Sequence, residues 1–125
     1  WVEVTTLIIP GLNDGEDEQG EIAAFIAQEL GPHVPWHISR FYPHYQLPDL
    51  PPTPVASLHR ARDIGHTAGL RYVYEGNVPG AGGEDTLCHH CGRPIIHRYG
   101  YQVQKVALQD GRCAHCGTPM GGVGL

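Results

Sequence analysis

Two copies of a Cys-x-x-Cys-Gly pattern constrain the fold of this chain more than any other feature. They occupy residues 88–92 and 113–117 and contain all four cysteines of the sequence. Two thiolates at this spacing can bind one cation, and the glycine after them accepts the positive φ of a tight turn. Two such turns supply a tetrahedral site, and their spacing is typical of zinc. The pattern predicts one zinc ion bound by Cys88, Cys91, Cys113 and Cys116.

Three other uses of the four cysteines stay open. Two disulfides would suit a short secreted chain, but the sequence shows no signal peptide. A redox Cys-x-x-Cys needs only one pair. Iron, as in rubredoxin, would be bound by the same two turns. A closed four-cysteine site has no position for a substrate, so we expect a structural metal, with His89, His90 and His115 outside the ligand set.

The region around the cysteines is expected to form a small module of its own. A glycine-rich linker, residues 77–86, precedes it. Residues 95–99 and 101–108 predict a hairpin between the two Cys turns, and Asp110-Gly111 predicts the turn that leads to the second of them. We therefore expect a zinc ribbon over residues 87–125, small enough for the metal to supply much of its folding free energy.

Residues 1–76 predict the α/β fold class. Runs of branched and aromatic residues predict buried strands over residues 1–9, 36–41 and 70–74, and a helical segment follows each of the first two. Strands separated by helices favour parallel pairing, because a parallel pair needs a long crossover connection. The order predicts a βαβαβ unit with parallel strands.

The two helices of this unit have recognisable ends. The first is expected over residues 15–30, with its apolar residues on one face and Asp14 placed to cap it. Thr53 and Pro54 predict the start of the second, as an N-cap followed by proline at the first helical position. Gly69 is expected to end it.

The βαβαβ unit predicts an incomplete core. Two helices can cover only one face of three strands, whereas a parallel sheet is normally covered on both. We expect the second face to be apolar, and to meet either another part of the protein or a second copy of the chain by self-association. The sequence begins at Trp1, inside a predicted strand, and its only methionine is Met120. We therefore interpret the chain as a fragment of a longer protein.

Charge and hydropathy argue against two classes of partner. The chain has a formal net charge of −5 at pH 7, which disfavours a nucleic-acid groove. Charges between residues 84 and 117 nearly cancel, so the ribbon has little attraction for a phosphate backbone. No apolar run is long enough to span a membrane. Reduced cysteines without a signal sequence predict a cytoplasmic protein.

The order of several short motifs resembles one enzyme family. Residues 4–14 (VTTLIIPGLND) resemble the fifth barrel strand and following loop of pyruvate formate-lyase activating enzymes, and residues 35–41 (PWHISRF) resemble the next strand. Residues 72–80 (YVYEGNVPG), followed by the two Cys turns, are similar to the C-terminal part of the AmmeMemoRadiSam-system radical SAM enzymes, a branch of the activating-enzyme-like group. The resemblance covers nearly the whole chain.

The resemblance implies that residues 1–76 are the late strands of a six-unit radical SAM half-barrel. In the full-length protein, a [4Fe-4S] cluster would reductively cleave S-adenosylmethionine to a 5′-deoxyadenosyl radical, which abstracts a hydrogen atom from a substrate. The cluster-binding Cys-x-x-x-Cys-x-x-Cys and the Gly-Gly-Glu-Pro-like motif are absent here and would lie upstream of Trp1. The resemblance thus implies a fragment that is inactive alone and whose partner is its own missing N-terminal barrel.

The cofactor cavity of such a barrel lies at the C-terminal ends of its strands. The residues expected to line the S-adenosylmethionine cavity are Pro10, Gly11, Ser39, Arg40, Tyr42 and His44. His44 is the nearest match to a histidine that contacts S-adenosylmethionine in an activating enzyme, and a shift of two residues would put Tyr42 in its place. Arg40 could pair with a carboxylate of cofactor or substrate.

A second class of function stays open beside the enzyme. The chain could be a zinc-ribbon binding module that docks a partner protein. A cluster-binding motif of three cysteines upstream of Trp1 would show that the enzyme, and not the binding module, is the correct interpretation.

Overall fold

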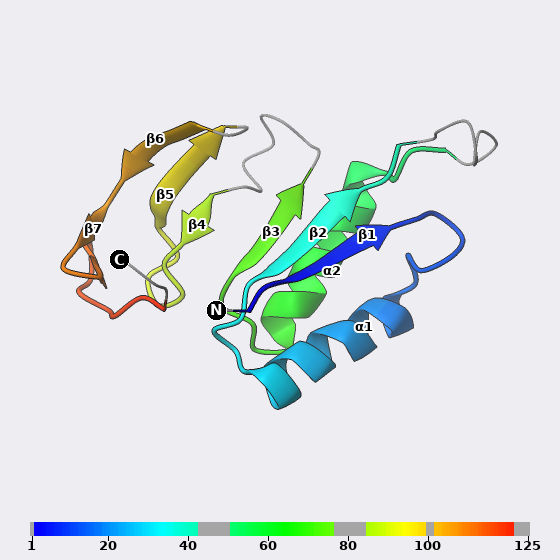
Figure 1. The fold of residues 1–125 in the computed structure, drawn as a ribbon, viewed down its shortest axis with the longest axis horizontal. Coiled ribbons are helices and arrows are strands. Elements are labelled where there is room, and N and C mark those ends of the chain that lie inside the picture. The colour runs from blue at the N-terminus through cyan, green and yellow to red at the C-terminus, as the bar shows by residue number, and fades with distance from the viewer. Residues whose placement is uncertain (1, 43–50, 77–84, 100–101, 122–125) are drawn as a thin grey trace. The chain divides into compact units, whose positions relative to one another are not determined.

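The computed structural model describes residues 2–42, 51–76, 85–99 and 102–121 (Figure 1). Residues 2–78 and residues 79–125 form two compact units. The boundary between them falls in the glycine-rich stretch that was expected to be a linker, of which residues 77–84 lie outside the described part. No helix in the described part of the chain is long and apolar enough to cross a membrane.

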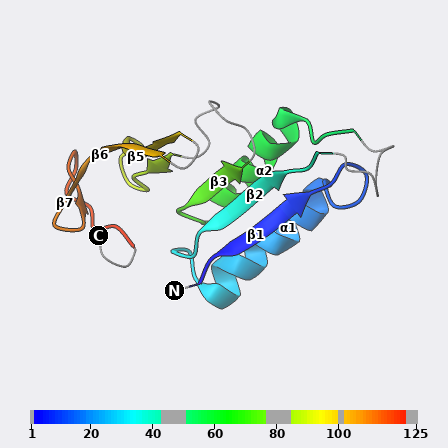
Figure 2. The same ribbon diagram turned by 45° about the horizontal axis from the view of Figure 1, so that its top comes forward.

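The first unit is built on three parallel strands, which confirms the predicted α/β class with a parallel sheet. The strands are β1 (Val4–Ile8), β2 (Trp36–Arg40) and β3 (Val73–Gly76), in the order β1-β2-β3 (Figures 1 and 2). β3 begins three residues later than predicted, because Leu70 and Tyr72 are buried in the approach to the strand rather than in the ladder.

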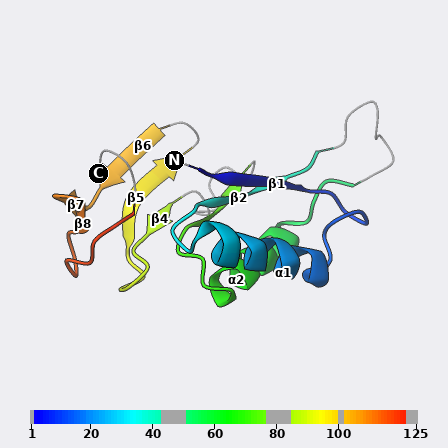
Figure 3. The ribbon, with the colours of Figure 1, turned by 60° about the horizontal axis from the view of Figure 1, so that its bottom comes forward.

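Helices cover one face of this sheet (Figure 3). They are α1 (Glu16–Phe25), the π-helical turn η1 (Ile26–Leu30) and α2 (Val55–Thr67). The buried cluster between helices and sheet consists of Ile8, Ala23, Ile26, Val34, Trp36, Ile38, Leu58, Ala61, Leu70 and Val73. Trp36 is its largest member, and the indole N–H donates to Thr6 Oγ1 at 3.0 Å. This bond satisfies the only polar atom that the Trp36 side chain brings into the core.

The opposite face of the sheet is largely polar, so the prediction of a second apolar face was wrong. Residues that neighbour one another across this face are Thr5, His37 and Tyr74, then Leu7, Ser39 and Gly76. The expected fully buried first strand was also wrong, because β1 alternates and Leu7 is 44% exposed. Alternation with one polar face is typical of a sheet that carries a single hydrophobic core.

His37 connects the strands on the polar face. Its Nε2 lies 2.7 Å from Glu3 Oε1, and its ring stacks on that of Tyr74 at 5.1 Å between centroids. Glu3 precedes β1, whereas His37 and Tyr74 lie on β2 and β3. The pair and the stack therefore link all three strands across the face that the helices leave uncovered.

The first helical segment ends at Leu30 as predicted, but it differs from the prediction in its cap and in the geometry of its last turn. Gly15 is the N-cap and no side chain caps the helix; Asp14 Oδ1 instead accepts the backbone N–H of Gly11 at 3.0 Å, inside the turn after β1. At the other end the N–H of Gly31 donates to Ile26 O at 2.8 Å, which widens the last turn to π geometry. Gly31 has a φ of 121° and precedes Pro32, so the helix cannot continue.

Thr53 does not cap α2, contrary to the prediction. Pro54 is the N-cap, and Thr53 is fully buried. The Thr53 hydroxyl donates to Ile8 O at 2.5 Å and accepts the backbone N–H of Phe41 at 2.9 Å. The Thr53 hydroxyl thus connects the ends of β1 and β2 to the start of α2. Its two partners, Ile8 and Phe41, lie 45 and 12 residues earlier in the sequence.

The second unit contains short antiparallel strands. β4 (Thr86–Leu87), β5 (Pro94–Tyr99) and β6 (Gln102–Val106) pair in the order β4-β5-β6, and β7 (Leu108–Gln109) pairs with β8 (Arg112–Cys113). The predicted hairpin between the Cys turns is thus present. Asp110 and Gly111 form the turn between β7 and β8 with φ of 53° and 73°, a conformation that aspartate and glycine tolerate.

Candidate metal centre

The two Cys turns have the same backbone geometry. The N–H of Gly92 donates to Cys88 O at 2.9 Å, and that of Gly117 donates to Cys113 O at 2.8 Å. The two glycines have φ of 74° and 79°, which confirms the positive φ expected from the sequence. A residue with a Cβ would be strained at either position. The repeat of one local pattern therefore produces two equivalent turns, each presenting two cysteines.

The four sulfur atoms form one compact group. All lie within 4.8 Å of one another, and two separations join the turns closely: Cys88 to Cys116 at 3.6 Å and Cys91 to Cys113 at 3.8 Å. A tetrahedron with metal–sulfur bonds of about 2.3 Å has edges of about 3.8 Å, so the donor set fits a four-coordinate metal ion. All four cysteines are free, and a disulfide would need about 2.05 Å.

The surroundings of the sulfurs divide the site into a buried and an exposed half. Cys88 and Cys113 are buried and cluster with Ile95, and Ile96, Leu108 and Met120 pack around them. Cys91 and Cys116 are exposed. In the described part of the chain, the group of side chains close enough to share a metal contains the four cysteines and no histidine.

Hydrogen bonds to sulfur make the four thiols unequal. The hydroxyl and backbone N–H of Thr118 lower the pKa of Cys116 to about 6, with Oγ1 at 3.2 Å from Sγ. The backbone N–H of Arg93 lowers the pKa of Cys91, but desolvation and the neighbouring sulfurs of Cys88, Cys116 and Cys113 outweigh it and raise that pKa to about 11. Without metal, the Cys116 thiol therefore ionises at a lower pH than the Cys91 thiol, which stays protonated at neutral pH.

The residues expected to line a cofactor cavity lie at the C-terminal ends of β1 and β2, which are neighbours in the sheet. Pro10 and Gly11 form the turn after β1, where Gly11 has a φ of 78°. Ser39 lies on the polar face beside Gly76, where an added Cβ would come within 3.2 Å of Ser39 Oγ. His44 lies outside the described residues.

Arg40 and Tyr42 are brought together after β2. The Arg40 guanidinium lies over the Tyr42 ring at 4.9 Å and donates to its hydroxyl at 3.0 Å. Arg40 Nε also donates to Thr53 O at 2.7 Å. These contacts fix the direction of the guanidinium at the C-terminal end of β2.

Sequence reasoning missed a buried carboxylate at Glu75. Its side chain has no solvent exposure, and Oε1 lies 2.6 Å from His59 Nδ1 and 3.6 Å from Arg62 Nε. Both partners come from α2, so the cluster fastens that helix to β3. The spacing of His59 and Arg62, three residues apart on one helix face, was the available signal, but it gave no indication of which strand would carry the carboxylate.

Comparison with known proteins gives one relative of undefined function. An uncharacterized protein of Methanocaldococcus jannaschii is 47% identical to this chain over 119 residues, which make up 94% of the chain and 36% of that protein. The chain therefore spans about a third of the length of this relative. No family model and no solved structure matches the chain.

Proposed function

We propose that the chain is the C-terminal part of a radical SAM enzyme of the pyruvate formate-lyase activating enzyme-like group, resembling the AmmeMemoRadiSam-system enzymes. The full-length protein would bind a [4Fe-4S] cluster and S-adenosylmethionine upstream and around the strand ends. The observation that carries this proposal is the parallel sheet with helices on one face and polar side chains on the other. A wall of this kind suits a barrel that encloses a cofactor and a substrate.

The chain's own residues would then bind and orient rather than perform the chemistry. Pro10 and Gly11 would shape the rim after β1, and Ser39 would offer a hydroxyl on the polar face. Arg40, held by Tyr42, would present a cation to a carboxylate. When bound, the cluster supplies the electron that cleaves S-adenosylmethionine, and no residue described here replaces it.

In this proposal the four cysteines bind zinc, and the ion is structural. Four thiolate ligands close the coordination sphere, so no open position is left for a substrate. The observation in favour is the match of the sulfur separations to a tetrahedral site. Keeping four thiols reduced and metal-bound suits the cytoplasm, where we place the protein. Iron in the same site would colour the protein red. Elemental analysis and a visible absorption spectrum therefore distinguish an iron-bound from a zinc-bound site.

The enzyme proposal is tested on the full-length polypeptide that contains this chain. Purified without oxygen and given iron, sulfide, a reductant and S-adenosylmethionine, it should form 5′-deoxyadenosine, whereas the 125-residue chain treated identically should form none. The chain is the matched control, because it carries the zinc site and lacks a three-cysteine cluster motif. Absence of 5′-deoxyadenosine from a full-length protein that holds a [4Fe-4S] cluster contradicts the proposal.

A binding role for the ribbon is the second candidate. The observation that favours it is the exposure of two valines, Val103 at 57% and Val106 at 56%, on a unit whose buried cluster is small. Exposed aliphatic side chains that lie together commonly mark a contact with another protein surface. A protein partner would then contact the ribbon whether or not the sheet unit belongs to an enzyme.

A further inference from the structure

The hairpin of the ribbon contains a β-bulge. His97 pairs with Lys105, but the next residue, Arg98, pairs with Val103, so Gln104 is an extra residue in β6. A bulge breaks the alternation of side chains along its strand. It also interrupts the outer edge of β6, which disfavours the addition of another strand there.

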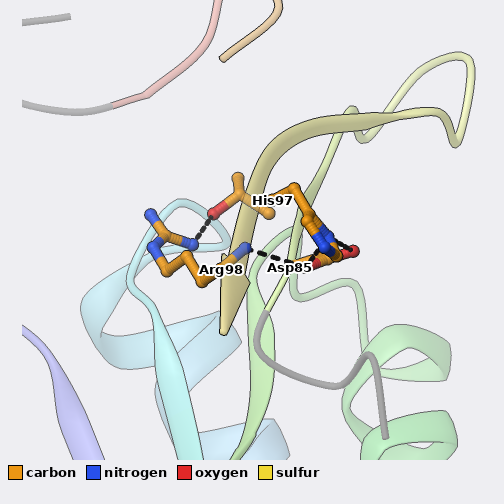
Figure 4. Close-up of polar contacts among 4 residues, drawn as sticks. Asp85, His97 and Arg98 are labelled. Carbon is orange, nitrogen blue, oxygen red and sulfur yellow. Dashed lines mark hydrogen bonds and ion pairs between the residues drawn. The ribbon is translucent and has the colours of Figure 1, made fainter. Parts of the chain in front are cut away.

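A carboxylate holds the bulge in place (Figure 4). The backbone N–H of Arg98 donates to Asp85 Oδ1 at 3.1 Å, and Asp85 Oδ2 lies 2.9 Å from His97 Nδ1. The Arg98 guanidinium in turn donates to the hydroxyl of Thr86. Asp85 thus bonds to both residues of β5 at which the register shifts, and its side chain is only 11% exposed.

The bulge turns two valines to the same face of the hairpin. Val103 and Val106 are three residues apart and would face opposite sides of a regular strand. With the extra residue between them, Val106 is opposite Ile96 and Val103 is opposite Arg98, and these partners are two residues apart on β5. Both valines nevertheless remain more than half exposed. The backbone irregularity therefore creates an apolar surface that the described residues of the ribbon leave exposed.

These valines border a shallow hollow of about 530 Å³. The side chains that line it are Ile96, Arg98, Val103, Val106, Leu108 and Asp110. Ile96 and Leu108 also pack against the cluster of Cys88, Ile95 and Cys113, so the floor of the hollow rests on the metal centre. Its shape should therefore depend on bound metal.

The charges of the hollow point to a particular occupant. Its lining contains one cation, Arg98, and one anion, Asp110, with aliphatic side chains around them. A two-fold axis that crosses the line from Arg98 to Asp110 would bring the cation of each copy to the anion of the other, with the valines in contact near the axis. A patch with a single sign of charge would repel its own copy.

We propose that this hollow is the contact surface of a symmetric dimer of the chain. Val103 and Val106 pack against the same valines of a second copy, and Arg98 faces Asp110 of the partner subunit. The two copies meet face to face, because the bulge in β6 disfavours pairing of two copies through the edges of their sheets. This inference goes beyond the proposed function and holds whether or not the full-length protein is an enzyme. We expect the dimer to be weak and reversible, because the contact is confined to the few side chains that line this hollow.

Sedimentation velocity of the zinc-loaded chain tests the proposal, over a range from about 10 µM to about 1 mM in which weak complexes dissociate. We expect a monomer–dimer equilibrium that Val106→Asp weakens about tenfold or more. Two controls place a charge on other exposed residues: Leu87→Asp in the ribbon outside the hollow, and Leu7→Asp on the polar face of the sheet. Neither substitution should change the dissociation constant of the dimer. A chelator that removes the metal should abolish the dimer, because the floor of the hollow rests on the metal centre.

Charge exchange gives an independent readout. Arg98→Glu and Asp110→Lys should each weaken the dimer, and the double variant should regain most of the lost affinity, which no defect of folding would do. Metal content and backbone amide spectra show which variants remain folded. If Arg98→Glu disturbs the bond to Thr86 or Asp110→Lys disturbs its turn, Asp110→Asn suffices, because asparagine tolerates the positive φ of this position and removes the charge. A chain that stays monomeric at all concentrations, or a dimer lost only with Leu7→Asp, overturns the proposal. Capture of a different protein by a monomeric ribbon also overturns it.

Discussion

At the scale of single residues, the ribbon concentrates its chemistry on four sulfur atoms that two glycines bring into position. The positive φ of Gly92 and Gly117 lets each turn close around its first cysteine, so both cysteines of a turn face the same point. Four thiolates so close together would repel strongly without a cation between them. The same arrangement thus requires a metal to be stable with its thiols ionised.

Replacing one cysteine tests that requirement. Cys113→Ser should abolish stoichiometric metal binding and unfold the ribbon, because three thiolates leave the tetrahedral site incomplete and the metal supplies much of the folding free energy of so small a unit. Elemental analysis and amide spectra measure the two effects. His90→Ala is the matched control, since it changes an exposed residue of the first turn and should keep one metal per chain. Full metal content in Cys113→Ser would contradict the site.

The unequal thiols predict how metal affinity varies with pH. Metal binds thiolates, so every thiol that is protonated without metal must release a proton on binding. Cys91, with a pKa of about 11, is protonated throughout the neutral range, whereas Cys116, with a pKa of about 6, gains its proton only near and below that value. Affinity should therefore fall as the pH falls, and more steeply below about pH 6, where one further proton is displaced.

Competition with a chromophoric chelator between about pH 8 and about pH 5 measures this slope. Thr118→Val removes the hydroxyl that lowers the pKa of Cys116, while keeping the backbone N–H. The steeper region should then begin at a higher pH than in the unchanged chain. A slope that is the same in both proteins would exclude Thr118 as the cause.

Residue roles could be predicted from the sequence where the partners are local. The cysteines and glycines of the two turns were predictable because each turn is closed within five residues. Asp14 and Thr53 were misassigned as caps because each found another partner: Asp14 within its own turn, Thr53 on strands 12 and 45 residues away. A capping propensity describes the competition for nearby N–H groups and contains no information on a distant strand end.

At the scale of elements, the fit of α2 against the sheet depends on one glycine. A Cβ at Gly65 would lie 3.0 Å from Trp36 Cε3 and 3.0 Å from Val73 Cγ2, tighter than normal packing. The close approach brings the helix onto the largest buried side chain of the unit. The parallel pairing was predictable from the βαβαβ pattern, but this contact depends on the positions of three elements at once.

Gly65→Ala should therefore destabilise the sheet unit by about 1–3 kcal/mol, the usual result of overpacking a core. Gly20→Ala is the matched control: Gly20 is also helical, and nothing lies within 4 Å of an added Cβ. That change should stabilise the unit by about 0.5–1 kcal/mol, because alanine loses less conformational entropy in a helix. Urea unfolding followed by helical circular dichroism measures both. Equal effects of the two substitutions would show that the close contact is unimportant.

The polarity of the second sheet face shows another limit of prediction at this scale. Counting helices indicated correctly that one face would lack a helical cover, but the argument that this face must be apolar assumed that it would be buried in a core. The strand residues themselves alternate, with Trp36 and Ile38 towards the helices and His37 and Ser39 away from them. Giving this period-two pattern more weight than the branched composition of the strands would have predicted the outcome.

At the scale of the whole molecule, the described residues form two hydrophobic clusters, each within one unit. The larger cluster lies entirely in residues 2–78 and includes ten buried residues, whereas the cluster of the ribbon includes three, two of which are cysteines. So few buried apolar groups are unlike a core that could offset the conformational entropy of ordering a ribbon, so we expect its stability to depend on a bound metal. We expect no such dependence of the sheet unit, because the four clustered cysteines all lie in the ribbon.

Removal of the metal should therefore unfold one unit and leave the other. All helices of the described chain, α1, η1 and α2, belong to residues 2–78, so helical circular dichroism reports on that unit. A strong chelator at neutral pH should leave this signal nearly unchanged, while the amide resonances of residues 85–99 and 102–121 collapse to positions typical of an unfolded chain. Returning zinc should restore them, because the two Cys turns refold locally around the ion. Loss of the helical signal in parallel with the metal would mean that the units fold as one, and would contradict the division of the chain into two independently stabilised parts.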